Sequence, residues 1–252
     1  MSTLTQRENE ARASAAPSSR GAGLVVFSGT VVLAVATICG FLPPTGVRTE
    51  WPVLLTLIGL AAFVGSRSVK VPALKIEVTA GDAFTFLGLL AVGPLAAPIV
   101  ALAGTASAVI ASDHFKRRRL KAIFNMASVT LSAAASAWAH QAILAGEQLG
   151  SYTYAVAVVV AGVTFGLVNT LLVALVMRIA TGTSVVSNWL GFGPWAVGSS
   201  MGSLLIALGL LSLIPSVGFA GLVLGLFGTR LVTTSIQAFR DSTGDVSDLT
   251  VS

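Results

Sequence analysis

The chain alternates between long apolar segments and short polar ones. The apolar runs are continuous, whereas β-barrel strands alternate apolar and polar residues over roughly 10 positions, so the pattern predicts helices. The first run, 22–42, spans about 21 residues, longer than a signal-peptide core of about 7–15, and we expect it to be a retained span. Further spans are expected at 51–65, 122–144, 154–176, 194–213 and 217–231, the last two joined by a tight turn at Ile214-Pro215-Ser216.

The apolar stretch 82–112 predicts a helical hairpin. One straight helix of this length would measure ~46 Å, more than a hydrocarbon core of ~30 Å requires. Gly93-Pro94 interrupts the stretch and leaves two helices of about 12 and 17 residues, each short for a full crossing. We therefore expect short or partly re-entrant helices that turn at Gly93-Pro94. Before them, strand-like alternation over 71–78 predicts a short ribbon or an extended loop.

These elements predict an all-α fold, a polytopic transmembrane helical bundle of six to eight helices. Eight is the preferred count, with both helices of the hairpin included. The expected organisation is a disordered cytoplasmic N-terminal tail over 1–21, a transmembrane domain over 22–232 and a short cytoplasmic tail over 233–252.

The composition supports a lipid-embedded chain. Only 10% of the 252 residues are charged, against about 25% in a typical soluble domain. Hydrophobic residues make up 54% of the chain, and the mean hydropathy is +0.88. Such a chain has too few polar residues to cover a soluble fold, so lipid must replace water around it.

The distribution of basic residues predicts the topology. The net charge of +5 does not require a nucleic-acid partner, because the basic residues cluster at the ends of the apolar runs, as the positive-inside rule expects. If the N-terminus is cytoplasmic and the 82–112 hairpin returns to the same side, every basic residue except Arg48 is cytoplasmic. Both termini are therefore expected in the cytoplasm.

Ionisable groups inside a bilayer are candidates for function, because their burial is costly without a partner. No Glu, Lys or Arg lies in the middle of a predicted span. Asp82 lies at a predicted helix start, where the helix dipole favours a carboxylate. It is either an N-terminal cap with an interfacial ion pair or a ligand or proton site.

Polar uncharged residues inside the spans form the second set of candidates. Ser128, Ser132 and Ser136 recur every fourth position and share one helix face, with Asn125 close to it. This face is suited either to helix packing or to the wall of a polar cavity. Asn169 lies midway along its span and is suited either to an interhelical hydrogen bond or to a ligand contact. The candidate ligand-binding residues are Asp82, Asn125, Ser128, Ser132 and Asn169.

Two further patterns indicate surfaces. Pairs of glycines separated by three residues predict faces where helices approach closely, within the bundle or between copies of the chain; they are Gly162 with Gly166, Gly198 with Gly202, and Gly221 with Gly225. A basic run can bind anionic lipid headgroups at roughly 1 kcal/mol per base, although its topological role already explains it. Its candidate headgroup contacts are Lys116, Arg117, Arg118, Arg119 and Lys121.

Enzymatic motifs are missing from the sequence. It has no H-E-x-x-H motif, and its two histidines, His114 and His140, cannot form a three-histidine zinc site. A lipid enzyme built on Asp82, Asn125 and His140 is disfavoured because His140 is expected near the outer end of its helix, as a hydrated interfacial residue, and the other two near the inner face. We expect no catalytic residues, no bound metal and no cofactor.

Residues 80–145 resemble a membrane module of bacterial signalling proteins. The stretches concerned are Asp82-Ala83-Phe84-Thr85-Phe86, Gly93-Pro94-Leu95-Ala96-Ala97, Lys116-Arg117-Arg118-Arg119 and Lys121-Ala122-Ile123-Phe124-Asn125. They are similar to the N-terminal module of HD-GYP and GGDEF proteins and, more distantly, to LytS-type sensors and to the substrate-binding subunits of energy-coupling-factor (ECF) vitamin transporters. This resemblance implies the bacterial cytoplasmic (inner) membrane. About a dozen residues follow Arg240, so we expect no cyclic-dinucleotide turnover to carry over.

Two functions remain open from the sequence. The first is a non-catalytic sensor or scaffold that binds a small or lipophilic ligand and signals to a cytoplasmic protein. The alternative is a transport component, either a substrate-capture subunit with an energising partner or a small permease. The interrupted helix at Gly93-Pro94 favours the alternative, because broken helices often line substrate sites.

Overall fold

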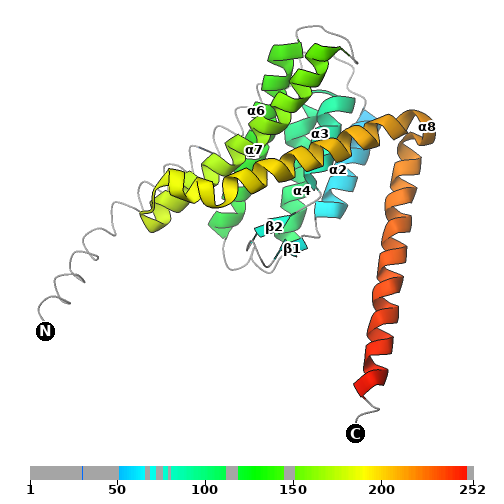
Figure 1. Ribbon diagram of the computed structural model, residues 1–252. Helices are drawn as coiled ribbons and strands as arrows, with labels where there is room; N and C mark the ends of the chain where they lie inside the picture. Colours follow the sequence, from blue (N-terminus) through cyan, green and yellow to red (C-terminus); the bar gives the residue numbers. More distant parts are fainter. Residues whose placement is uncertain are drawn as a thin grey trace, which may run out of the picture. The chain divides into compact units, whose positions relative to one another are not determined.

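The computed structural model describes residues 30, 51–65, 69–71, 76–78, 81–111, 119–144 and 151–248. Apart from one ribbon of two strands, the described elements are helices, which confirms the predicted all-α membrane bundle (Figure 1). In chain order they are α2 (Trp51–Gly65), β1 (Val69–Val71), β2 (Ile76–Val78), α3 (Gly81–Ala91), α4 (Ala96–Ala111), α6 (Arg119–Leu144), α7 (Tyr152–Thr181) and α8 (Val185–Asp248). The predicted span 22–42 lies outside the described residues except for Thr30.

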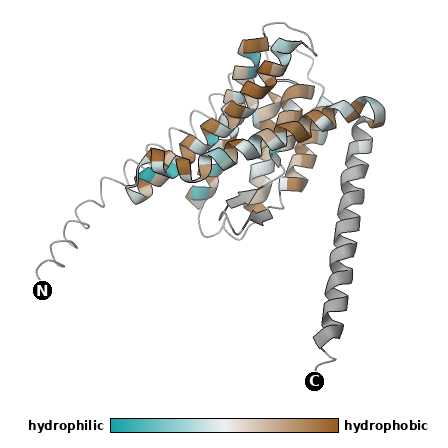
Figure 2. Ribbon diagram, in the orientation of Figure 1, coloured by the Kyte–Doolittle hydropathy of each residue, from teal (hydrophilic) through white to brown (hydrophobic). Residues whose placement is uncertain are grey.

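Three of the described helices are long and apolar enough to cross a membrane. They are Leu120–Leu144 within α6, all of α7, and Val185–Gly218 within α8. Apolar residues recur along all three of these segments (Figure 2). The helices α2, α3 and α4 are apolar but shorter. The chain is therefore a helical membrane protein.

The α6–α7 pair forms an antiparallel hairpin in the bundle. Ser128 on α6 contacts Asn169 on α7, while Ser136, eight residues further along α6, contacts Ala161, eight residues earlier on α7. At α7's start the Ser151 side chain caps the helix by accepting a 3.1 Å hydrogen bond from the Tyr154 backbone N–H.

The C-terminus of α7 ends at a glycine. Gly182 adopts the left-handed conformation, with φ of 74°, and its N–H donates a 2.7 Å hydrogen bond to the Arg178 carbonyl. A left-handed backbone is strained for residues with a side chain. Because α7 ends here, Arg178 lies in its last turn. In the antiparallel pair, this end of α7 is on the same side as the start of α6, where Lys121 lies.

The predicted hairpin at Gly93-Pro94 is confirmed by α3 and α4. These helices are 11 and 16 residues long and pack against each other. Gly93 has φ of +124°, a conformation that L side chains rarely adopt, and its carbonyl accepts a 3.1 Å hydrogen bond from Ala96 N–H. The Phe86 ring of α3 meets the Phe165 ring of α7 edge to face at 5.2 Å, and both are fully buried. The short hairpin is thus packed on the long helices.

Helices α2 and α4 approach each other closely. They pack where Gly65 faces Gly104, and a Cβ atom at Gly65 would overlap the Gly104 carbonyl oxygen.

The two short strands form a ribbon. Strands β1 and β2 are antiparallel, with Val69 opposite Val78 and Val71 opposite Ile76. The strand-like alternation over 71–78 therefore predicted a ribbon correctly.

The prediction of two helices joined by a break is confirmed here, but their bounds differ. Instead of 194–213 and 217–231 with a turn at 214–216, the helical segment α8 begins at Val185 and continues to Asp248, with two helices that meet at a kink. The break falls at Gly218, with φ of 64° and ψ of 172°. A proline fixes φ near −65°, which a helix accepts, whereas a positive φ is available mainly to glycine. The described residues up to Leu208 form one compact unit, and those from Gly209 onwards form a second.

Candidate functional site

Two candidate residues from the sequence meet in the structure. The Ser128 hydroxyl of α6 donates a 3.1 Å hydrogen bond to the Asn169 Oδ1 of α7. Ser132 lies one turn further along α6, fully buried, and its hydroxyl donates to the Ser128 carbonyl at 2.7 Å. Ser128 is also fully buried, while Asn169 is half-buried. The serine face of α6 is therefore turned towards α7, and Ser128 and Asn169 join the two helices inside the bundle.

The remaining candidates lie apart from this contact. Asn125 is exposed on α6, one turn before Ser128. Asp82 lies in the first turn of α3, at the start of the short hairpin. No recorded hydrogen bond of the described residues joins either one to Ser128 or Asn169.

A second polar contact lies on the other side of α7. The Trp189 Nε1–H of α8 donates a 2.9 Å hydrogen bond to the Thr170 hydroxyl oxygen, and that hydroxyl donates to the Gly166 carbonyl at 2.7 Å. Thr170 is 2% exposed. The Trp189 indole lies over Gly193, where a Cβ atom would be 2.5 Å from the ring. Sequence analysis missed this contact because it placed the helix start at Pro194, after Trp189.

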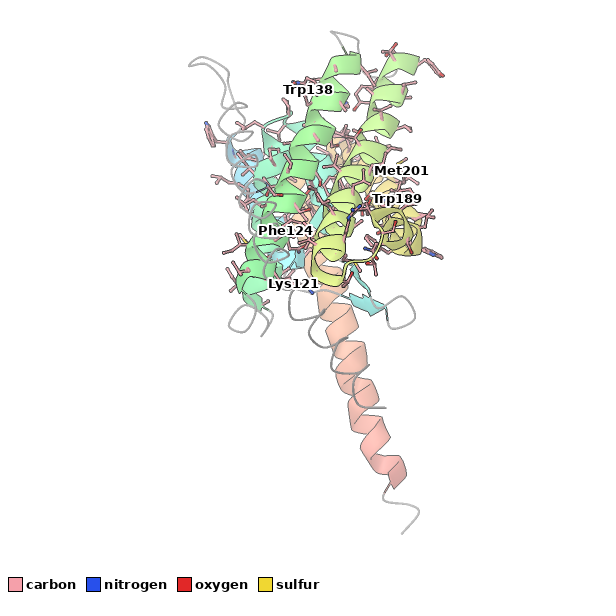
Figure 3. The ribbon with its side chains drawn as sticks, turned by 90° about the vertical axis from the view of Figure 1, so that its left-hand side faces the viewer. Lys121, Phe124, Trp138, Trp189 and Met201 are labelled. Carbon is pink, nitrogen blue, oxygen red and sulfur yellow. The ribbon has the colours of Figure 1, made fainter. Side chains whose placement is uncertain are left out.

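Together these residues form the α7 polar cluster, defined as Ser128, Asn169, Thr170 and Trp189. Asn169 and Thr170 are neighbours in sequence, and neighbouring helix positions differ by about 100° around the axis. Asn169 therefore faces α6 while Thr170 faces α8. Figure 3 shows Trp189 and Met201 on the first part of α8 beside α7. In an apolar bundle, such a cluster provides hydrogen-bonding groups without charge.

The three glycine pairs predicted from the sequence differ in how closely other parts of the chain approach them. A Cβ atom at Gly162 would be 2.8 Å from the Leu204 and Met201 side chains, and one at Gly166 would be 2.9 Å from the Val197 backbone. This pair is the close-approach face that the sequence predicts. Gly198 and Gly202 have open space at the Cβ position. A Cβ atom at Gly221 would meet Val217 of its own helix, and the surroundings of Gly225 lie outside the described residues.

His140 lies near one end of α6, as the sequence predicts, but it is more buried than expected. It is 6% exposed, rather than hydrated, and its ring meets the Tyr154 ring of α7 edge to face at 6.0 Å. It is 15 residues beyond Asn125 on the same helix, which is ~22 Å along the axis. This separation argues against a shared active site. Among the described residues, no group of three or more His, Cys, Asp or Glu is placed to hold a metal.

The basic run is described only in part. Lys116, Arg117 and Arg118 lie outside the described residues, and Arg119 begins α6. Lys121 is exposed, and Figure 3 shows it at the end of α6 opposite Trp138. A headgroup contact by this run stays a prediction.

The similarity of this chain to known proteins lies in its fold. No family model and no curated protein matches the chain. A solved structure of the S component of a bacterial ECF transporter matches with a TM-score of 0.51 at 16% identity, over 66% of this chain and 94% of that chain. At this identity the match shows the fold. It supports the ECF part of the predicted resemblance, while the likeness to HD-GYP, GGDEF and LytS-type modules finds no support.

Proposed function

We propose that this chain is a non-catalytic transport component that captures a small substrate in the membrane. The fold match to the S component of a bacterial ECF transporter, which covers 94% of that chain, carries this proposal. It favours the transport alternative over the sensor that sequence analysis placed first. Since fold alone does not fix function, the proposal also depends on the polar groups inside the bundle.

The α7 polar cluster supplies the proposed substrate contacts. Polar side chains inside a membrane bundle are costly unless paired, and they commonly mark substrate pathways. Ser128 and Asn169 already pair with each other, and the Asn169 side chain remains partly accessible. We assign the substrate contacts to these two residues, with Ser132 as a positioning residue through the Ser128 carbonyl. Asp82 and Asn125 are not part of this centre.

The α3–α4 hairpin also favours transport. Its two helices are short, and they meet at a turn with a positive φ at Gly93. Interrupted helices in transporters place backbone groups and helix ends within the membrane, where they line substrate sites. Phe86 brings this hairpin against α7 through Phe165, four residues before Asn169.

Uptake driven by a nucleotide would need an energising protein partner, because the sequence has no Walker A loop that could bind a nucleotide. Lys121 and Arg178 lie at one end of the α6–α7 pair. Under the positive-inside rule that end is cytoplasmic. We propose the bacterial cytoplasmic membrane as the location and the cytoplasmic side as the face where the partner docks.

The deciding experiment is native mass spectrometry of the gently solubilised chain, followed by uptake into proteoliposomes. We expect a small molecule to co-purify with the wild-type chain and with Asn125→Ala, but to be lost from Asn169→Ala. Asn125 is the matched control because it is an exposed asparagine on the neighbouring helix. The same molecule should enter proteoliposomes when a membrane fraction containing the partner is included.

Other outcomes would reject the proposal. If the chain retains a molecule but does not take it up under any condition, the result favours the sensor function over transport. Equal retention by Asn169→Ala and the wild type would remove the α7 polar cluster from the substrate site.

A further inference from the structure

Two polar side-chain atoms are buried at one end of the α6–α7 pair, and within the described part of the chain neither has a hydrogen-bond partner. They are the His140 Nε2 on α6 and the Tyr154 hydroxyl on α7; His140 is buried as a whole residue, whereas Tyr154 is half-buried. Their rings meet edge to face, with centroids 6.0 Å apart and planes at 84°. We call these two residues the His140–Tyr154 pair. It lies outside the α7 polar cluster, 12 residues beyond Ser128, which is ~18 Å along α6.

Leaving these atoms unpaired is energetically unfavourable. A buried donor or acceptor without a partner costs about 1–3 kcal/mol, and most buried polar atoms in folded proteins are hydrogen-bonded. Here two such atoms lie on facing helices and do not bond each other. A third group that bonds both atoms would remove this cost.

The described residues one helical turn from the pair carry no charge, and among them Ser136, one turn before His140, is polar and buried. One helical turn away from His140 and Tyr154 lie Ala137 and Ala157, both fully buried. The charged residues of α6 and α7 are at the opposite end. Lys121 is ~28 Å along α6 from His140, and Arg178 is ~36 Å along α7 from Tyr154. A charged ligand group would lose its hydration here without gaining a counter-charge from these helices, which favours a neutral group.

The chemistry of the two atoms narrows the ligand class. A tyrosine hydroxyl both donates and accepts, and the Nε2 of a neutral imidazole does either, depending on the tautomer. A neutral amide carries a donor and an acceptor side by side. We propose that the His140–Tyr154 pair binds the amide, or a similar neutral donor–acceptor group, of a small ligand with an apolar body.

Exposed aromatic side chains flank this end of the helix pair. Trp138 is 69% exposed and Tyr152 is 86% exposed, one on each helix and each two residues from the pair. Exposed aromatic residues are typical of the membrane–water interface, where an amphipathic ligand would enter.

The inference is tested with three probes of similar shape. These are 4-fluorobenzamide, which is neutral with donor and acceptor, 4-fluorobenzoate, which is charged, and 4-fluorotoluene, which has no hydrogen-bonding group. Binding to the chain in nanodiscs is followed by fluorine NMR, with empty nanodiscs subtracted. We expect the amide to bind about tenfold more tightly than either of the others, which corresponds to two hydrogen bonds at ~0.7 kcal/mol each.

Matched variants locate the binding. Tyr154→Phe and His140→Phe keep an aromatic ring and remove the polar atom, and each should weaken amide binding about three- to tenfold. Tyr152→Phe removes an exposed hydroxyl from the same helix and should change nothing. If Tyr154→Phe binds the amide as the wild type does, or if the three probes bind equally, the pair holds only water and the inference is overturned.

A measurement on the wild-type side chains guards against misfolded variants. The chain has two histidines, so selective ring labelling gives two signals, and His114→Gln assigns them. A nuclear Overhauser effect from bound 4-fluorobenzamide to the His140 ring supports the inference, and its absence at saturating probe overturns it. Because binding is measured on the isolated chain, the result is independent of whether the chain transports a substrate.

Discussion

The Ser128 hydroxyl of α6 donates a 3.1 Å hydrogen bond to the Asn169 side-chain oxygen of α7. Interhelical hydrogen bonds in membrane proteins contribute about 0.6 kcal/mol on average and about 1.7 at most. We expect Ser128→Ala and Asn169→Ala to show a coupling energy of about 0.6 kcal/mol in a double-mutant cycle. The free energy of unfolding in bicelles measures it.

Ser132→Ala paired with Asn169→Ala is the control cycle, because the Ser132 hydroxyl bonds its own helix at the Ser128 carbonyl. Equal coupling in the two cycles would show that the measured energy does not come from the Ser128–Asn169 hydrogen bond.

Gly65 allows α2 to approach α4. A Cβ atom at Gly65 would overlap the Gly104 carbonyl oxygen, which belongs to the backbone and cannot rotate away. Gly65→Ala should therefore lower the free energy of unfolding by about 1–3 kcal/mol, as overpacking does. On the same helix, Gly59 has open space, so Gly59→Ala should be neutral or stabilising by up to about 1 kcal/mol through helix propensity. Equal effects of the two changes would contradict the close approach.

The two glycines of α7 should differ in sensitivity. At Gly162 the nearest atoms are ends of the flexible Met201 and Leu204 side chains, whereas at Gly166 the nearest is the Val197 Cα. We expect Gly166→Ala to destabilise the chain by about 1–3 kcal/mol and Gly162→Ala by less, because side chains rearrange more easily than backbone. Thermal unfolding of the two variants gives the comparison. Gly198→Ala is the control with open space, and an equal loss there would reject the explanation.

Gly193 is required by the Trp189 indole. A Cβ atom at position 193 would be 2.5 Å from the ring, so Gly193→Ala should displace the ring and break its hydrogen bond to Thr170. We expect a loss of about 1–3 kcal/mol in the free energy of unfolding. In a Trp189→Ala background the same change should cost nothing further, because the obstructing ring is gone. An undiminished cost in that background would show that the strain comes from another neighbour.

Sequence reasoning predicted elements well where chain length and local chemistry decide the structure. The 82–112 stretch is too long for one crossing and contains Gly93-Pro94, and the structure turns there. It placed helix bounds incorrectly where a proline was taken as the boundary: the helix starts at Val185 rather than Pro194, and the break lies at Gly218 rather than at Pro215. Pro194 and Pro215 both lie inside α8, since a proline costs one hydrogen bond but keeps a helical φ. The tertiary contact between Trp189 and Thr170 holds the segment before Pro194 on α7.

Individual residues of the candidate site could be predicted from the sequence, but the contact between them could not. The spacing of Ser128, Ser132 and Ser136 places them on one face, and they are all buried. The sequence does not show which residue faces that serine row across the bundle, so the Ser128–Asn169 contact required the structure. The burial of His140 was not predicted for a similar reason, because Tyr154, whose ring it contacts, lies on the next helix.

The neighbouring residues Asn169 and Thr170 give α7 a particular mechanical role. One bonds α6 and the other bonds α8, in directions about 100° apart around the helix axis. Any rotation of α7 about its axis, or sliding along it, therefore strains both contacts together. Because the two contacts come from adjacent residues, a displacement of α7 relative to one neighbouring helix also changes its contact with the other.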